Sequence, residues 1–261
     1  MISINKISPE TCQAVKVIAT DFDGTLTINS LLTGNVLNCL LQLQQQGISV
    51  IIVTGRSAGW VNALRYYLPV VGAIAENGGL YDHNPETPPD FLVSLPPKHR
   101  QQLAAVFASL QLNFPNLKES TDNPFRFTDW TFDVAGLSQD ELVQLEAQCE
   151  EKGYSFTYSS VQGHIKPQGQ DKATGLQAVL KQYFSDVKPE EVITIGDSPN
   201  DQSLFNPQLF PVSVGVANIK PYQQQLTYTP RYVTAEEEGK GFCELGNQLI
   251  SSWEKLQTKM S

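Results

Sequence analysis

The chain has 261 residues, 41% of them hydrophobic, and a formal net charge of −9 with an isoelectric point near 4.8. This size is compatible with one large domain or with a main domain and a smaller one, and we favour the second arrangement. The negative charge is offset by no basic cluster, which argues against nucleic acid as a partner.

Cysteine and histidine show none of the spacings that indicate a metal or disulfide framework. The cysteines at positions 12, 39, 149 and 243 are far apart, and the three histidines lack zinc-ligand spacing, so we expect neither disulfides nor structural zinc. No stretch approaches the ~18 apolar residues of a membrane span, and the first twenty residues show no leader pattern. We expect a soluble, cytoplasmic protein without a membrane partner.

The first predicted strand, residues 15–19, runs directly into Asp21-Phe22-Asp23-Gly24-Thr25. Carboxylates one residue apart at the carboxyl end of a strand lie where α/β sheets form their ligand crevice. Together they can hold a hard cation, and one of them can also attack phosphorus. The alternative is that Asp23-Gly24 forms only a turn.

A second buried strand, residues 48–53, follows a predicted helix at 31–46 and ends in Thr54-Gly55-Arg56. A hydroxyl and free backbone N–H groups at this position suit a phosphate oxygen. The alternative is an ordinary helix cap with a surface arginine. A helix at 58–68, in which Trp60 and Tyr66 are expected to serve packing, and a strand at 70–75 follow.

Residues 80–164 open with a proline-rich stretch and differ from the preceding segment in their pattern of elements. They predict a separate small α+β domain, with helices at 98–110 and 138–152 and strands at 125–134 and 154–159. Arg126, Trp130 and Asp133 fall on the first of these strands. Two interpretations remain open: the strand presents Arg126 to the crevice, or it is an ordinary surface strand, which we favour. His164 either touches a ligand or serves the return to the core, and we favour the hinge role.

Strand and helix alternation then resumes, so the first domain is discontinuous, with residues 1–79 and 165–261 on either side of the insert. The predicted elements are a helix at 171–184, a strand at 191–195, a short helix after residue 200, strands at 211–216 and 231–233, and a helix at 242–256. These elements predict an α/β fold with a Rossmann-like parallel sheet and an inserted α+β domain.

Two motifs in this second half carry further chemistry. Lys172 lies in the first turn of a predicted helix, where the dipole favours negative charge, so its ammonium group requires a nearby anion. Lys166 suits this role less well. Asp197 and Asp201 follow a strand with Asn200 between them, and Asp197 could complete a magnesium shell. The alternatives are a solvated lysine behind a helix cap, and a capped turn before a helix.

Together, Asp-x-Asp-x-Thr, the strand-end Thr54, Lys172 and Gly-Asp-x-x-x-Asp resemble the signatures of the haloacid dehalogenase superfamily of phosphatases. The large insert after Thr54, with Glu76-Asn77-Gly78-Gly79 at its entrance, resembles the Cof-type, class IIB branch. That branch includes phosphatases of sucrose phosphate, trehalose phosphate and mannosyl-3-phosphoglycerate. The resemblance covers essentially the whole chain and implies a cap domain at 80–164.

The resemblance implies that Asp21 is the nucleophile, that Asp23 is the general acid and base, and that Mg²⁺ is held by Asp21, Asp23 and Asp197 with Asp201 behind them. It places Thr54, Gly55, Arg56, Lys172 and Asn200 around the phosphate. We therefore expect a magnesium-dependent phosphatase acting through an aspartyl-phosphate on a small phosphorylated metabolite, such as a sugar phosphate. The alternatives are a phosphotransferase of the same mechanism, or a ligand-binding protein without turnover. The oligomeric state does not follow from the sequence.

Overall fold

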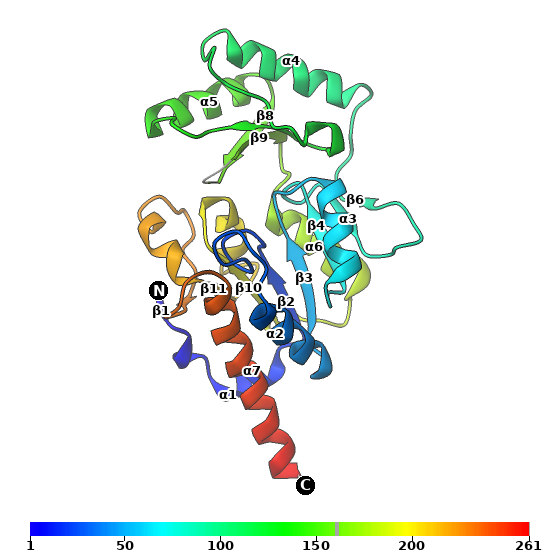
Figure 1. Cartoon of the computed structure of the whole chain (residues 1–261), viewed down its shortest axis with the longest axis vertical. Helices are drawn as coiled ribbons and strands as arrows, with labels where there is room; N and C mark the ends of the chain where they lie inside the picture. Colours follow the sequence, from blue (N-terminus) through cyan, green and yellow to red (C-terminus); the bar gives the residue numbers. More distant parts are fainter. Residues whose placement is uncertain (160–161, 261) are drawn as a thin grey trace.

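The computed structural model describes residues 1–159 and 162–260, and in these a nine-stranded sheet forms the core (Figure 1). Its strands lie in the order β1-β12-β11-β10-β2-β3-β4-β5-β6, parallel from β1 to β4 and antiparallel at β5 and β6. The strands are β1 (Ile2–Ser3), β2 (Val17–Thr20), β3 (Ser49–Val53), β4 (Gly72–Ala75), β5 (Leu80–Asp82), β6 (Asp90–Phe91), β10 (Val192–Gly196), β11 (Val212–Gly215) and β12 (Tyr232–Val233).

Helices cover both faces of this sheet because the central strands are apolar on both sides. Ile18 and Ile52 point to the face packed by α1, α2, α3 and α7, whereas Val17 and Ile51 point to the face packed by α6 and η4. The helices are α1 (Pro9–Ala14), α2 (Gly34–Gln45), α3 (Ala58–Tyr67), α6 (Lys172–Tyr183) and α7 (Glu238–Met260), and the 3₁₀ turns are η1 (Ile4–Lys6), η3 (Pro189–Glu191), η4 (Pro199–Phe205) and η5 (Ala217–Tyr222).

A second sheet of three antiparallel strands, in the order β7-β9-β8, belongs to the inserted part of the chain. It is built from β7 (Trp130–Asp133), β8 (Tyr154–Tyr158) and β9 (Gln162–Pro167), with α4 (His99–Gln111), α5 (Gln139–Glu151) and the turn η2 (Asn123–Phe125). Helices α4 and α5 pack on the sheet face that points away from the core (Figure 1) and share a separate apolar cluster with it. The other face of this sheet is turned toward the acidic motifs.

The register of the core sheet brings those motifs together. Thr20 at the end of β2 pairs with Ile195 of β10, and it also pairs with Ile52 of β3. Because these parallel strands end at the same edge, the residues that follow each of them meet there. The α/β fold class expected from the sequence is confirmed.

Several elements differ from the expected ones. The strand expected at 125–134 is confined to β7, because Pro124 lies in a 3₁₀ turn and the following residues hydrogen bond to the core. β9 was not expected, and it includes His164, which therefore lies within the second sheet. β5 and β6 lie inside the expected insert at 80–164 but pair with the core sheet. We therefore propose that the cap begins after β6 and ends with β9, in place of residues 80 and 164.

Candidate active site

The nucleophile candidate Asp21 follows β2 and is almost fully buried against the side chain of Lys172. The Nζ of Lys172 donates to Oδ1 of Asp21 at 2.7 Å and to Oδ1 of Asp201 at 2.6 Å. Asp171 caps helix α6 by accepting from the N–H of Thr174, which fixes the start of the helix and with it the lysine. The anion that Lys172 was expected to require is thus a pair of carboxylates.

Asp21, Asp197 and Asp201 form a buried acidic cluster, with one carboxylate oxygen of each lying within 4.8 Å of the others. Burial and the charge of Asp201 raise the pKa of Asp21 to about 7, although Lys172 opposes this shift. Burial and the neighbouring carboxylates also hold the pKa of Asp197 well above its usual range. Buried carboxylates that repel one another in this way suit a hard divalent cation, which would relieve the repulsion.

The backbone at Gly24 passes close to the carboxylate of Asp197. Its carboxylate accepts from the hydroxyl of Thr25 at 3.0 Å and from the amide of Asn218 at 3.1 Å. Gly24 has a φ of +77°, and a Cβ at this position would lie only 2.6 Å from Oδ2 of Asp197. Glycine is therefore required here both by the left-handed backbone and by the carboxylate beside it. The donor set fits Mg²⁺, because Asp21 and Asp197 belong to one acidic cluster and both line the same cavity.

Asp201 lies behind this pair. Its Oδ2 accepts from the backbone N–H groups of Asp197 and Ser198, at 2.9 and 3.2 Å, while Oδ1 holds Lys172. The carboxylate thus orients both the loop that carries Asp197 and the lysine that contacts Asp21. The supporting role expected of Asp201 stays a prediction.

Arg56 makes a contact that the sequence did not predict. Its Nε and Nη2 donate to the two carboxylate oxygens of Asp23, both at 2.7 Å, so it holds Asp23 in a bidentate pair. The guanidinium also lies 4.5 Å from the ring centroid of Trp60, which in turn packs edge-on against Phe22. Arg56 was expected among the phosphate ligands, but in this structure its guanidinium is committed to Asp23. The hydrogen bonds and the charge of Asp23 raise the pKa of Arg56 above its ordinary value.

A cavity of about 70 Å³ lies between the acidic edge of the core sheet and the inserted sheet. The core lines it with Asp21, Asp23, Thr54, Gly55, Arg56, Asp197, Ser198 and Asn200, and the insert lines it with Ser159, Gln162 and His164. The structure therefore brings together all of the core residues expected at the site, with Lys172 and Asp201 beneath the lining. Thr54 is buried and its Oγ1 accepts from the N–H of Arg56 at 3.1 Å.

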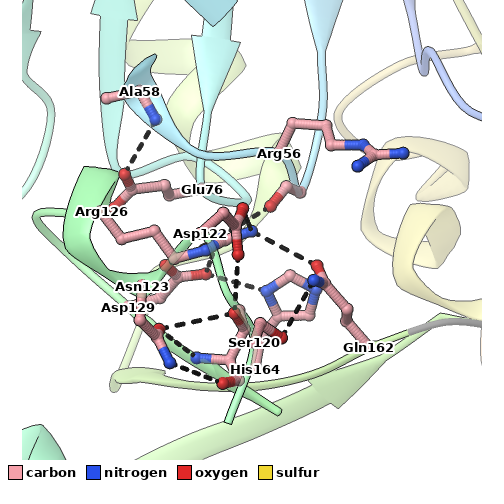
Figure 2. A network of polar contacts seen from close by, with 12 residues as sticks. Arg56, Ala58, Glu76, Ser120, Asp122, Asn123, Arg126, Asp129, Gln162 and His164 are labelled. Carbon is pink, nitrogen blue, oxygen red and sulfur yellow. Dashed lines mark hydrogen bonds and ion pairs between the residues drawn. The ribbon is translucent and has the colours of Figure 1, made fainter. Parts of the chain in front are cut away.

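The insert is fastened to the core beside this cavity by a network centred on Arg126 (Figure 2). Arg126 is buried and donates to the carbonyl of Gly55, to both oxygens of Asp129, and to Asp122. The guanidinium of Arg56 points away from this network (Figure 2). Both interpretations of Arg126 were wrong, because the residue lies on no strand and is neither on the surface nor among the residues that line the cavity.

Glu76 forms a second set of hydrogen bonds between the core and the insert. Its carboxylate accepts from the N–H of Ala58 in the core and from the N–H groups of Phe127 and Thr128 in the insert, and it also accepts from the Thr128 hydroxyl. Burial raises the pKa of Glu76 to about 7, against these hydrogen bonds. Its position in a Glu-Asn-Gly-Gly turn at the entrance to the insert was the one sequence signal that could have identified it. Trp130 and Asp133, also considered for the site, do not line the cavity.

Comparison with known proteins supports an enzymatic site. The family model of sucrose-6F-phosphate phosphohydrolase matches residues 14–244. A phosphoglycolate phosphatase of Metallosphaera sedula is 29% identical over 243 residues, which cover 91% of this chain and 100% of that relative. None of the helices in the described residues has the length and hydropathy of a membrane span.

Solved structures share the fold. A protein of Thermoplasma acidophilum superposes with a TM-score of 0.72 at 20% identity, covering 90% of this chain and 98% of that one. A sugar phosphatase of haloacid dehalogenase subclass IIB superposes with a TM-score of 0.63 at 15% identity, covering 84% and 93%. The resemblance found in the sequence is thus confirmed. The chain shares its fold with the subclass IIB sugar phosphatase, belongs to the sucrose-6F-phosphate phosphohydrolase family and is a phosphoric monoester hydrolase.

Proposed function

We propose that this phosphatase is magnesium-dependent and hydrolyses a small phosphorylated metabolite of the sugar phosphate class through an aspartyl-phosphate on Asp21. The observation that carries the proposal is the buried contact of Lys172 with Asp21 and Asp201, in which Asp21 lines the cavity and the other two residues lie beneath it. The names of the matched family and of the subclass IIB neighbour support a sugar phosphate, whereas the phosphoglycolate phosphatases support a compact phosphate ester more generally.

The reaction has two steps, formation and hydrolysis of the aspartyl-phosphate. A carboxylate oxygen of Asp21 attacks phosphorus, the bond from phosphorus to the leaving oxygen breaks, and Asp23 gives that oxygen its proton. Asp23 then takes a proton from the water that cleaves the aspartyl-phosphate and releases inorganic phosphate. The pair with Arg56 orients the ionised Asp23 carboxylate at the cavity for the second step. In the first step one of these two hydrogen bonds opens, because the oxygen of Asp23 that carries the proton donates it to the leaving oxygen.

The remaining groups bind the phosphoryl group and stabilise its charge. Lys172 balances the charge of Asp21, while Thr54, the backbone at Gly55 and Asn200 lie around the cavity where phosphoryl oxygens would bind. Asp21, the backbone carbonyl of Asp23 and Asp197 would hold Mg²⁺. When bound, the ion would neutralise the phosphoryl oxygens and permit Asp21 to remain ionised at neutral pH.

The test is phosphate release from sugar phosphates, glycerate phosphates, phosphoglycolate and nucleotides, with Mg²⁺ or with EDTA, for the wild type beside Asp21→Asn. Release that requires Mg²⁺ and is lost in Asp21→Asn supports the proposal. Transfer of phosphate to an added polyol acceptor in preference to water would assign a phosphotransferase. A folded protein that binds Mg²⁺ and substrate without releasing or transferring phosphate would contradict both.

A further inference from the structure

Two thiols meet where α2 and α7 pack against each other on one face of the core sheet (Figure 1). Cys39 lies in α2 and Cys243 in α7, and the S–H of Cys39 donates to the sulfur of Cys243. A Cβ built on Gly246 would lie only 2.3 Å from Sγ of Cys39. Residues three positions apart share one side of a helix, so Gly246 and Cys243 both face α2. The glycine thus permits the close approach of the two helices that brings the sulfurs together.

The two thiols differ in exposure and in acidity. Cys39 is 3% exposed, whereas Cys243 is only half-buried. The hydrogen bond from Cys39 lowers the pKa of Cys243 below its ordinary value, and the same bond together with burial raises the pKa of Cys39. The thiolate is the form of cysteine that reacts with oxidants. Cys243 is therefore the thiol that an oxidant attacks first, and Cys39 is the thiol placed to react with the product.

The other two cysteines have different surroundings. Cys12 accepts a hydrogen bond from the amide of Gln248, with 3.8 Å between Nε2 and Sγ. Cys149 is buried in the inserted part of the chain, where burial raises its pKa to about 12. Within residues 1–159 and 162–260, only Cys39 and Cys243 have another thiol as a partner.

The two helices that carry this pair are joined to the catalytic loops. The loop that follows β2 leads directly into α2, and its Thr27 carbonyl accepts from the N–H of Gly239 in the first turn of α7 at 3.0 Å. The N–H of Glu238 donates to the side chain of Asn218 at 2.9 Å, and the amide of Asn218 donates to Asp197 at 3.1 Å. A shift of α7 relative to α2 is therefore transmitted to the acidic edge of the sheet.

We propose that Cys39 and Cys243 are a redox-active pair, which a peroxide converts into a disulfide between α2 and α7. The Cys243 thiolate attacks one oxygen of hydrogen peroxide, the O–O bond breaks, and a sulfenic acid and one water form once the leaving hydroxide takes a proton. The sulfur of Cys39 then attacks the sulfenic sulfur, and the S–H proton of Cys39 leaves with the sulfenic oxygen as a second water. Two thiols are oxidised to one disulfide, and one peroxide is reduced to two waters.

The disulfide changes the spacing of the two helices. Its sulfurs lie about 2 Å apart, which is closer than the contact distance of two free thiols. Forming the bond therefore draws α7 toward α2 one turn after Glu238 and Gly239, which connect α7 to Asn218 and Thr27. Small displacements of catalytic groups slow an enzyme strongly, so the oxidised protein should be a slower phosphatase.

The experiment compares the wild type with Cys39→Ala, Cys243→Ala and the control Cys149→Ala. Each protein is treated with hydrogen peroxide, the peroxide is removed, and the remaining thiols are blocked with N-ethylmaleimide. Peptide mapping without reduction identifies the cross-linked and oxidised cysteines. Hydrolysis of 4-nitrophenyl phosphate with Mg²⁺ and urea unfolding are measured before oxidation, after oxidation, and after reduction with dithiothreitol.

We expect a Cys39–Cys243 cross-link in the wild type and in Cys149→Ala. Their phosphatase activity should fall by about tenfold, because a displacement of about 1 Å can cost up to about a hundredfold. The midpoint of urea unfolding should rise, since the disulfide constrains the unfolded chain. Dithiothreitol should reverse both changes. In Cys39→Ala, Cys243 should be oxidised to the sulfinic acid without a cross-link, whereas in Cys243→Ala the buried Cys39 should stay reduced.

Three outcomes would overturn the proposal. The first is a wild type in which Cys243 is oxidised to the sulfinic acid while Cys39 remains free, because the two sulfurs would then be unable to bond. The second is a cross-link that appears only in urea, which would show that the folded protein does not form it. The third is a complete cross-link with unchanged activity, which would exclude the effect on the catalytic loops. Mapping of the wild type decides the first two outcomes even if a cysteine variant fails to fold.

Discussion

Replacing Lys172 with methionine should destabilise the protein and slow its chemistry, because one buried ammonium group balances two carboxylates. The side chain of Lys172 is fully buried, and its Nζ lies 2.7 Å from Asp21 and 2.6 Å from Asp201. Removing one partner of a buried ion pair costs about 3–5 kcal/mol, because the remaining charges lose their compensation. Lys172→Met keeps the apolar stem, so the loss reports on the charge.

The pH dependence of this variant has a defined sign. Burial and Asp201 raise the pKa of Asp21 to about 7 even with Lys172 present, and removing the lysine raises it further. A carboxyl group with a raised pKa in the folded state contributes stability that is lost as the pH rises through that pKa. The destabilisation of Lys172→Met should therefore be larger at pH 8 than at pH 5. Its phosphatase rate should fall by about 10²–10³ at pH 7 and recover partly at higher pH, where Asp21 ionises.

The assay combines urea unfolding in EDTA and in Mg²⁺ with phosphate release from pH 6 to 9. Lys166→Met is the matched control, because Lys166 is also buried but hydrogen bonds to the carbonyl of Gln170 in place of a carboxylate. We expect the control to change the free energy of unfolding by about 1 kcal/mol or less and to retain activity. A loss below 1 kcal/mol in Lys172→Met, or a wild-type rate at pH 7, would show that the ammonium group does not balance the two carboxylates.

Three other variants test the groups around the cavity. Arg56→Met should lower kcat by about 10–100-fold with little change in KM, because Asp23 loses the bidentate partner that orients it, and steady-state kinetics with an activated and an unactivated ester measure this. Glu76→Gln should flatten the decline of the free energy of unfolding between about pH 4.5 and 7. The raised pKa of Glu76 makes the folded state bind a proton that the unfolded state has lost, and glutamine removes this difference. Urea unfolding at several pH values measures the decline, and a slope equal to that of the wild type would contradict this. Arg126→Met should cost about 3–5 kcal/mol and raise KM, since Asp129 is left buried with one partner fewer, and a variant as stable as the wild type would contradict this.

The acidic edge of the sheet was predictable because its causes are local. Apolar runs of strand length end at Asp21, Thr54 and Asp197, and parallel strands in one sheet bring their carboxyl ends together whatever the detailed packing. The helix boundary that places Lys172 follows from the Asp171 cap, which is also a local signal. The α/β fold and the meeting of these four segments therefore followed from the sequence.

The cap side was less predictable because its partners are distant in the chain. Phe127 and Thr128 are β-prone residues, yet their N–H groups bond to the carboxylate of Glu76, about fifty positions earlier, and not to a neighbouring strand. β9 contains His164 and Lys166, which are polar but buried. His164 hydrogen bonds to the Asp129 carboxylate and Lys166 to the Gln170 carbonyl. A pattern of hydrophobicity cannot identify such a strand, since its burial depends on tertiary partners.

The pairing of Arg56 with Asp23 shows the same limit at the centre of the site. The two residues are 33 positions apart, and either side chain could have pointed at phosphate or at solvent. Their bidentate contact depends on how the turns after β2 and β3 face one another, and on Trp60, which lies beside the guanidinium. The motif alone predicted the residues but not which of them would hold the general acid.

Phosphorylation of Asp21 can be tested by trapping the phosphoenzyme. The Asp23→Asn variant is mixed with a radiolabelled activated ester and Mg²⁺. The reaction is quenched in acid within the first turnover, and the protein is digested for peptide mapping. We predict stoichiometric label on the peptide containing Asp21, with no label in Asp21→Asn. Phosphate release by the wild type at normal rates with no label on Asp21 in either protein, under conditions in which acyl phosphates survive, would contradict it.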